Sequence, residues 1–417
     1  MSETIDFTDR DDIEGETEAA PPELYAANLV EWAIDRYASD LFVSDAEHCV
    51  VVSVRRLGKI EVVRRLARNY GRRLQGHLRV LAGADAGETI RPSDGRAVMH
   101  IPSGRDIDMR LSSIPTLFGQ DIAIRLFDPG DGSRSLETLG LDRHEMSAVD
   151  HLLDLSAGLV LLTGPTASGK SSTLYAMLER MNDGTRKIHT LEDPIEHALE
   201  NVIQTQVNLR AGLDFADLLS VVLRHSPDVI MIGEIRDART AATAVRAGAS
   251  GQLVLATVHA KSAAEAVDSM LHYQTNPKFL ASALIGVINQ RLVRKLCSNC
   301  RQPLELDQPV PMPEHIAYRL DGRQPTLYKP VGCQECFKDG FQDLTCMPEI
   351  MVVNRELSEA ISHGASSYEL EALARQHGML TLGDSAMIRA LSGVTTPQEA
   401  NRQVFSSELA ELSGLYH

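Results

Sequence analysis

The spacing of apolar side chains changes several times along the chain and divides it into segments. Residues 1–22 carry eight acidic side chains and few apolar ones, so we expect a flexible tail with too little apolar surface to pack. From residue 23 apolar residues recur at helical spacing as far as Ile34. Strand patterns, alternating or β-branched, follow at residues 50–54, 107–111 and 122–126. Residues 23–128 are therefore expected to form a small α+β domain.

A turn-rich polar stretch at residues 129–135 is expected to link this domain to a second one. Beyond it, short apolar runs alternate with helical segments, which is typical of an α/β domain with a buried, mostly parallel sheet. The expected strands are residues 159–163, 187–191, 229–232 and 253–258. We place this core at residues 136–295, a cysteine-containing region at 296–346 and a helical region at 347–417.

Charge and apolar content narrow the classes of function. The chain has 41 Lys and Arg against 57 Asp and Glu, a net charge of −16. Proteins that bind nucleic acid usually carry a basic surplus, so we expect no nucleic-acid partner. The sequence contains no run of about 18 apolar residues, so we expect no transmembrane helix. The acidic N-terminus also lacks the pattern of a secretory signal. A cytoplasmic protein is expected, with any membrane association made through partners.

The strongest motif for chemistry is Gly164–Ser171, which fits G-x-x-x-x-G-K-[ST]. It follows an apolar strand and precedes a helical run, which disfavours a chance match in a glycine-rich turn. Backbone N–H groups of such a loop bind phosphate at a helix N-terminus. Lys170 is expected to bridge the β- and γ-phosphates of ATP, and Ser171 to hold Mg²⁺. The expected nucleotide-binding residues are Gly164, Thr166, Ser168, Gly169, Lys170, Ser171 and Ser172.

Three further side chains are candidates for hydrolysis. Glu234 ends the apolar run 229–232 and is expected to act as general base or to position water, although it could instead start the next helix. Glu192 opens an acidic cluster that could assist the base and hold Mg²⁺ through water, or form only an acidic turn. His259 ends another apolar run and could sense the γ-phosphate, although a lone His there is more often structural.

Two cysteine pairs form a second strong motif. Cys297 and Cys300 are followed by Cys333 and Cys336, each pair with the C-x-x-C spacing. In a reducing compartment this pattern favours one tetrahedral metal over disulfides, although unmetallated thiols in a loop would share the spacing. Four thiolates leave no open coordination position, so we expect a structural Zn²⁺.

At this point the sequence resembles the secretion ATPases that power type II secretion and type IV pilus assembly. The resemblance covers about residues 23–405 and rests on separate blocks. They are the Walker A segment 164–175, the "Asp box" 190–196, the Walker B segment 223–237, the "His box" 253–259 and the N-terminal strings Asp94-Gly95-Arg96 and Asp108–Ser112.

The resemblance implies a hexameric ring of two-lobed subunits, each with a RecA-like P-loop core and a PAS-like N-terminal domain. ATP would bind between the lobes, and Arg110 and Arg125 match the arginine fingers that close onto the γ-phosphate. The paired cysteines look like the zinc knuckle of the assembly branch. The implied partners are further copies of the chain and an inner-membrane platform protein of a pilus or secretion system. The implied location is the cytoplasmic face of the bacterial inner membrane.

The chain also departs from the family pattern. By comparison with that pattern, we expect no long N-terminal extension of the kind that docks many assembly ATPases. Single differences are Ala167 where Gly is usual, Gln120 where Glu is usual, Gln252 where His is common and Phe42 where His is frequent. Alternatives are a conjugation or retraction ATPase, a nucleotide-binding regulator with little turnover, and a nucleic-acid translocase, which the acidic balance disfavours.

Overall fold

The computed structural model describes residues 20–85, 87, 89–127, 134–305, 310, 312–404 and 406–414. The predicted tail, except for its last residues, and most of the predicted linker lie outside the described residues. The chain divides into two compact units, Met1–Gly132 and Ser133–His417. Among the described residues no helix combines the length and the apolar character needed to span a bilayer.

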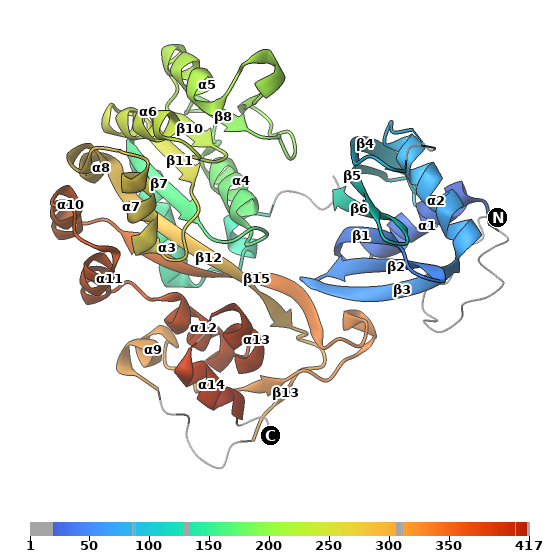
Figure 1. The fold of residues 1–417 in the computed structure, drawn as a ribbon. Helices are drawn as coiled ribbons and strands as arrows, with labels where there is room; N and C mark the ends of the chain where they lie inside the picture. Colours follow the sequence, from blue (N-terminus) through green and yellow to red (C-terminus); the bar gives the residue numbers. More distant parts are fainter. Residues whose placement is uncertain are drawn as a thin grey trace. The chain divides into compact units, whose positions relative to one another are not determined.

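The N-terminal unit is one antiparallel sheet with helices on one face (Figure 1). Its strand order is β3-β2-β1-β6-β5-β4. Alternate strand residues are buried against α1 and α2, which is why the sequence alternates along the strands. The elements are α1 (Pro22–Ile34), β1 (Ala38–Asp45), β2 (Cys49–Arg56), β3 (Lys59–Ala67), α2 (Arg68–Leu81), β4 (Ser93–His100), β5 (Asp106–Thr116) and β6 (Gly119–Phe127).

The second unit is built on a seven-stranded sheet of order β15-β12-β7-β11-β10-β8-β9. All neighbours are parallel except β12 and β15, which pair antiparallel over a long register. The strands are β7 (Gly158–Thr163), β8 (Ile188–Glu192), β9 (Ile203–Gln206), β10 (Val229–Ile232), β11 (Leu253–Thr257), β12 (Leu284–Leu296) and β15 (Phe341–Val352). The four central strands are buried on both faces, as their unbroken apolar runs predict.

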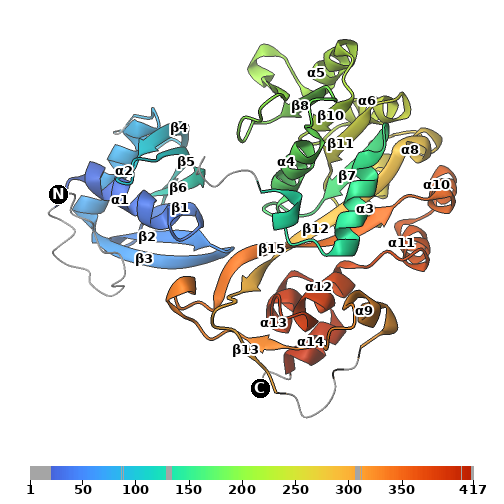
Figure 2. The same ribbon diagram turned by 180° about the vertical axis from the view of Figure 1, so that it is seen from behind.

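Helices cover both faces of this sheet (Figures 1 and 2). One face packs against α3 (Arg143–Asp154) and α4 (Lys170–Met181). The other face packs against α5 (Phe215–Val222), α6 (Ala238–Ala249), α7 (Ala263–His272), α8 (Pro277–Ala283), α10 (Arg355–Ser362) and α11 (Ser367–Gln376). This is a three-layer α/β arrangement, so the expected fold class is confirmed.

A smaller core lies beside the outer part of β12 and β15. It contains α9 (Glu314–Arg319), α12 (Leu382–Leu391), α13 (Pro397–Gln403) and α14 (Ser407–Gly414), with the short pair β13 (Gln302–Pro303) and β14 (Tyr328–Lys329) nearby. The structure differs here from the boundaries expected from the sequence. The last strand of the main sheet, β15, falls within the stretches we assigned to the cysteine region and the helical region, because its partner β12 lies some 50 residues earlier.

Candidate functional site

The phosphate loop joins β7 to α4 through backbone conformations that require glycine. Gly164 has φ +143°, and a Cβ there would lie 2.5 Å from the carbonyl oxygen of Gln290. Gly169 caps α4 with φ +85°. Lys170, Ser171 and the exposed Ser172 follow as the first turn of α4, so the unpaired N–H groups at the start of this helix lie beside the loop.

Lys170 is folded back onto the loop. Its Nζ donates to the carbonyl oxygens of Gly164 at 2.9 Å and Pro165 at 3.0 Å. Partial burial lowers its pKa, Glu234 opposes that shift, and Arg291 adds to it. Lys170 is therefore within electrostatic reach of both side chains. An ammonium that is held only by neutral carbonyls can exchange them for phosphate oxygens.

Glu234 is the centre of a charged cluster on the segment between β10 and α6. Its Oε1 accepts from His259 Nε2 at 2.5 Å, and its Oε2 accepts from Arg236 Nε at 2.7 Å. Burial alone would raise the pKa of Glu234, but Arg236 and His259 outweigh it and the pKa is lowered. The helix α6 begins only at Ala238, capped by Asp237, so the alternative that Glu234 starts a helix is wrong.

Hydroxyl groups at the strand ends hold this cluster in place. Thr257 Oγ1, at the end of β11, donates to the Gly233 carbonyl at 2.6 Å. Thr163 Oγ1, at the end of β7, accepts from Ala260 N–H at 2.7 Å and lies 3.0 Å from the Ala260 carbonyl oxygen. These bonds link three neighbouring strand ends and fix the chain on both sides of His259. The carboxyl ends of parallel strands are where α/β sheets bind ligands.

Glu192 has a different environment from Glu234. It is the last residue of β8 and is buried, and its carboxylate accepts from Tyr175, from Thr190 Oγ1 at 2.5 Å and from Gln204 Nε2 at 3.1 Å. Burial and the contact with Glu192 raise the pKa of Tyr175, which is on α4. In this arrangement Glu192 ties the phosphate-loop helix to the neighbouring strand.

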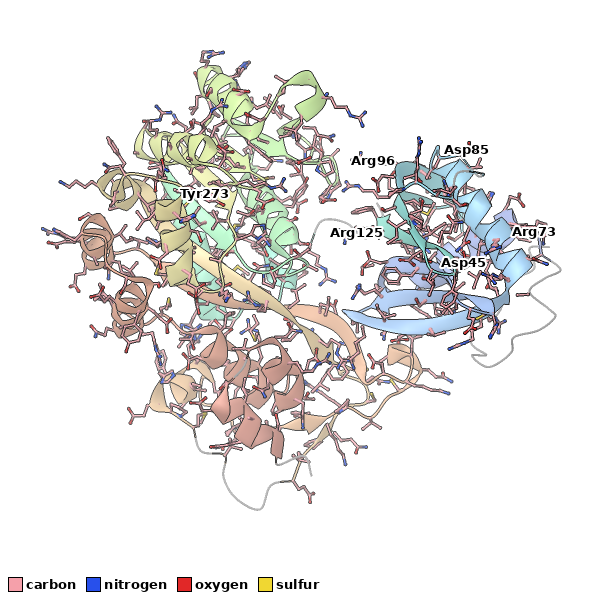
Figure 3. All side chains as sticks on the ribbon, in the orientation of Figure 1. Asp45, Arg73, Asp85, Arg96, Arg125 and Tyr273 are labelled. Atoms are coloured by element: carbon pink, nitrogen blue, oxygen red, sulfur yellow. The ribbon has the colours of Figure 1, made fainter. Side chains whose placement is uncertain are left out.

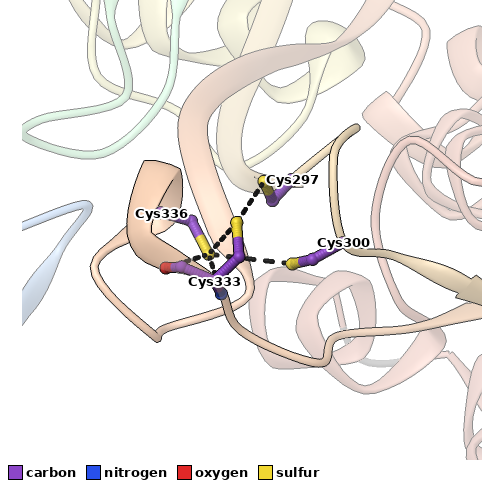
Figure 4. Close-up of side chains that lie close together, drawn as sticks. All are labelled: Cys297, Cys300, Cys333 and Cys336. Atoms are coloured by element: carbon purple, nitrogen blue, oxygen red, sulfur yellow. Dashed lines mark hydrogen bonds between the residues drawn. The ribbon is translucent and has the colours of Figure 1, made fainter.

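The four paired cysteines converge at one point (Figure 4). All four Sγ atoms lie within 4.8 Å of one another, and the Cys297–Cys333, Cys300–Cys336 and Cys333–Cys336 Sγ–Sγ distances are 3.7–3.8 Å. A tetrahedron with Zn–S bonds of about 2.3 Å has sulfur–sulfur edges of about 3.8 Å, so the donor set fits zinc. Backbone N–H groups of Gly332 and Gly340 donate to Cys300 and Cys336 at 3.2 Å, which favours thiolates. The clustering expected from the spacing is confirmed.

With this geometry in view, comparisons with known proteins identify the family. The model of the type II/IV secretion system protein family matches residues 15–402. The chain belongs to this family. It is 38% identical over 400 residues to the type II secretion system protein E of Dickeya dadantii, covering 95% of this chain and 78% of that protein. It is 34% identical over 399 residues to the type IV pilus assembly ATPase PilB of Pseudomonas aeruginosa, covering 96% of this chain and 70% of that protein.

Solved structures agree on the fold of this type II/IV secretion family member. The Legionella pneumophila ATPase DotB matches with a TM-score of 0.68 and 19% identity, covering 94% of this chain and 99% of that one. The pilus retraction motor PilT matches with a TM-score of 0.61 and 23% identity, covering 92% and 97%. The family resemblance and the P-loop ATPase fold expected from the sequence are therefore confirmed.

In the N-terminal unit of this family member, Arg110 and Arg125 lie directly opposite each other on β5 and β6. Arg125 Nε is 3.2 Å from Asp40 Oδ1, and the Arg110 guanidinium lies 4.7 Å from the centre of the Phe127 ring. The two candidate arginine fingers are thus adjacent within one sheet. Their role at a phosphate group stays a prediction.

We did not predict from the sequence that Gln290 contacts the phosphate loop of this family member. Gln290, on β12, donates from Nε2 to the Ser168 carbonyl at 2.7 Å and lies against Gly164. Its neighbour Arg291 acts electrostatically on Lys170. The one available signal was a polar Asn-Gln-Arg run at 289–291 that interrupts an apolar stretch. The pairing of β12 with β7, which brings this run to the loop, is not readable from spacing.

Proposed function

We propose that the chain hydrolyses ATP with Mg²⁺ and uses the energy to drive assembly of a type IV pilus or a type II secretion pseudopilus. The observation that supports this most is that Lys170 and Glu234 follow the carboxyl ends of β7 and β10, which both pair parallel with β11, in a member of the type II/IV secretion family. Its relatives include a type II secretion protein E and a type IV pilus assembly ATPase.

In this proposal ATP lies against the loop 164–172, and Lys170 leaves its two carbonyls for the β- and γ-phosphates. Ser171 would hold Mg²⁺, which would supply positive charge against the charge that develops on the phosphates. Glu234 orients the attacking water, and its lowered pKa keeps it ionised and able to accept a proton. His259, already bonded to Glu234, reports the γ-phosphate to Glu234.

The proposal further includes Zn²⁺ bound by Cys297, Cys300, Cys333 and Cys336 as a structural ion, which matches the donor geometry. It includes a homohexamer, with Arg110 and Arg125 closing on the γ-phosphate. It includes a position at the cytoplasmic face of the bacterial inner membrane, reached through an inner-membrane platform protein. No nucleic-acid partner belongs to this proposal, in keeping with the net charge of −16.

The test is steady-state ATP hydrolysis across a protein concentration series, with Lys170→Ala and Glu234→Gln beside the wild type. An assembled motor gives a rate per chain that rises with concentration, and both variants fall to background. Arg65→Ala, on an exposed edge-strand position, serves as the matched control and keeps the wild-type rate. A wild type that turns over no faster than the two site variants would instead favour a nucleotide-binding regulator.

A further inference from the structure

Five charged residues form a straight row across the N-terminal sheet. In order across β2, β1, β6, β5 and β4, each residue is the register partner of the next. The row is Arg55, Asp40, Arg125, Arg110 and Arg96. Because directly opposed residues of an antiparallel sheet point to the same face, the five side chains share one face.

This row lies on the face of the sheet that carries no helix. The neighbouring strand positions, such as Leu41, Ile124 and Leu111, are buried against α1 and α2 on the opposite face. Figure 3 shows Arg96 and Arg125 on the same side of the unit. The row borders a shallow depression of about 480 Å³, whose lining includes Asp40, Asp94, Arg96, Arg110, Ser112 and Arg125.

The charges along the row are unbalanced. Its single carboxylate, Asp40, lies 3.5 Å from Arg55 Nε and 3.2 Å from Arg125 Nε, so it is already shared by two guanidinium groups. The side chain of Arg96 is exposed and makes no hydrogen bond or ion pair with any residue that the structure describes. Like charges directly opposite on neighbouring strands destabilise a sheet. An anion bound over Arg96, Arg110 and Arg125 would relieve this repulsion.

The backbone holds Arg96 in this register. A Cβ on the preceding residue, Gly95, would lie 2.0 Å from the Ala82 carbonyl oxygen at the end of α2. Only glycine allows β4 to approach α2 this closely. The backbone at Arg96 is therefore fixed by the fold, which keeps this residue in the row beside Arg110.

We propose that Arg96 is a third arginine that binds the phosphate oxygens of the nucleotide, beside Arg110 and Arg125. The inference rests on the proposed ATP hydrolysis for its ligand, since three guanidinium groups in a row match the spread charge of a triphosphate. Asp40 has a positioning role, because it orients Arg125 along the row while no anion is bound.

The first test compares Arg96→Ala with Arg65→Ala in the full chain. Arg65 is an exposed arginine on the edge strand β3 of the same sheet but lies outside the row. Arg96→Ala is expected to lower kcat by roughly tenfold or more and to weaken nucleotide binding, whereas Arg65→Ala changes neither. Equal rates for Arg96→Ala and Arg65→Ala, with both chains folded by circular dichroism, overturn the proposal. Should Arg96→Ala fail to fold, Arg96→Gln replaces it in the same comparison.

A second measurement separates this inference from the proposed function. In a Lys170→Ala chain, which removes the main phosphate contact of the core, calorimetry follows the binding of inorganic triphosphate. Adding Arg96→Ala is expected to weaken this binding, whereas adding Arg65→Ala leaves it unchanged. If the wild type hydrolyses no ATP, the proposed function fails and this comparison alone decides the inference. Equal triphosphate affinity in the two double variants then overturns it.

Discussion

At the scale of single residues, Ala167 shows what a departure from the family pattern costs. It has φ +61° in the phosphate loop, a left-handed conformation that disfavours a side chain with a Cβ. Ala167→Gly should raise the free energy of unfolding by about 1 kcal/mol, because glycine adopts this conformation freely. Thermal unfolding measures the change. Ala176→Gly, inside α4, is the matched control and should destabilise; a drop for both variants would contradict the strain argument.

Gln120, which stands where the family usually has Glu, contacts the buried side chain of Arg79. Its Oε1 accepts from Arg79 Nη1 at 3.0 Å, and Arg79 is only 1% exposed. Nε and Nη2 of Arg79 have no hydrogen-bond partner among the described residues. Gln120→Glu would give this buried cation a carboxylate and is expected to stabilise the N-terminal unit by about 2 kcal/mol in urea unfolding.

The control for Gln120→Glu removes the cation as well. In Arg79→Met/Gln120→Glu a carboxylate is left buried without a charged partner, so this double variant should be less stable than Arg79→Met alone. If the carboxylate stabilises the chain equally with and without Arg79, the gain does not come from the ion pair. This comparison is a double-mutant cycle and isolates the pairwise energy.

Glu349 should make stability depend on pH. It is buried on β15, where it accepts from the N–H groups of Ala263 at 2.5 Å and Leu382 at 3.2 Å. Burial raises its pKa. Between the unfolded and the raised folded pKa the native state binds more protons, so its contribution to stability grows as the pH falls.

The measurement is the difference in Tm between wild type and Glu349→Gln. It should shift in favour of the wild type as the solution is taken from about pH 8 to about pH 5, since protonation removes the buried charge that the variant never carries. All other titrating groups are shared by the wild type and the variant, so their effects cancel in the difference in Tm. A difference that shifts the opposite way would mean that Glu349 is more stable ionised than burial implies.

At the scale of elements, the cysteine cluster joins the loop after β12 to the loop before β15, and these two strands are neighbours at one edge of the sheet. Cys300→Ser should abolish zinc binding, from about one ion per chain to none, and lower Tm because the metal free energy is lost from the folded state. Metal analysis of the purified chain measures it. Cys49→Ser, outside the cluster, is the control and should keep the metal.

The elements also show how far the sequence alone could go. Strand β10 was predicted within the observed bounds, because a short apolar run flanked by polar residues has few other interpretations. The phosphate loop followed from its motif for the same local reason. Local patterns could not predict which distant segments contact one another. These contacts are the pairing of β15 with β12, the hydrogen bond from Gln290 to the phosphate loop, and the pairing of Arg96 with Arg110. These depend on register between segments far apart in the sequence.

At the scale of the whole molecule, the chain separates its chemistry between two units. The phosphate loop and Glu234 belong to the second unit, and the arginine row belongs to the first. In the proposed mechanism catalysis needs groups from both units, since an arginine stabilises transition-state charge only once it reaches the phosphate.

Mixing two inactive variants tests whether each chain completes its own site. Arg110→Ala damages only the N-terminal arginine, and Glu234→Gln damages only the core. If the arginine acts within its own chain, every site in a mixed assembly carries one defect, and hydrolysis stays at background at every ratio. If activity recovers, an intact Arg110 from a Glu234→Gln chain is serving the core of a neighbour. Mixing each variant with wild type controls for subunit exchange, because exchange into shared assemblies changes the rate per wild-type chain, whereas dilution by a variant that does not exchange leaves that rate unchanged.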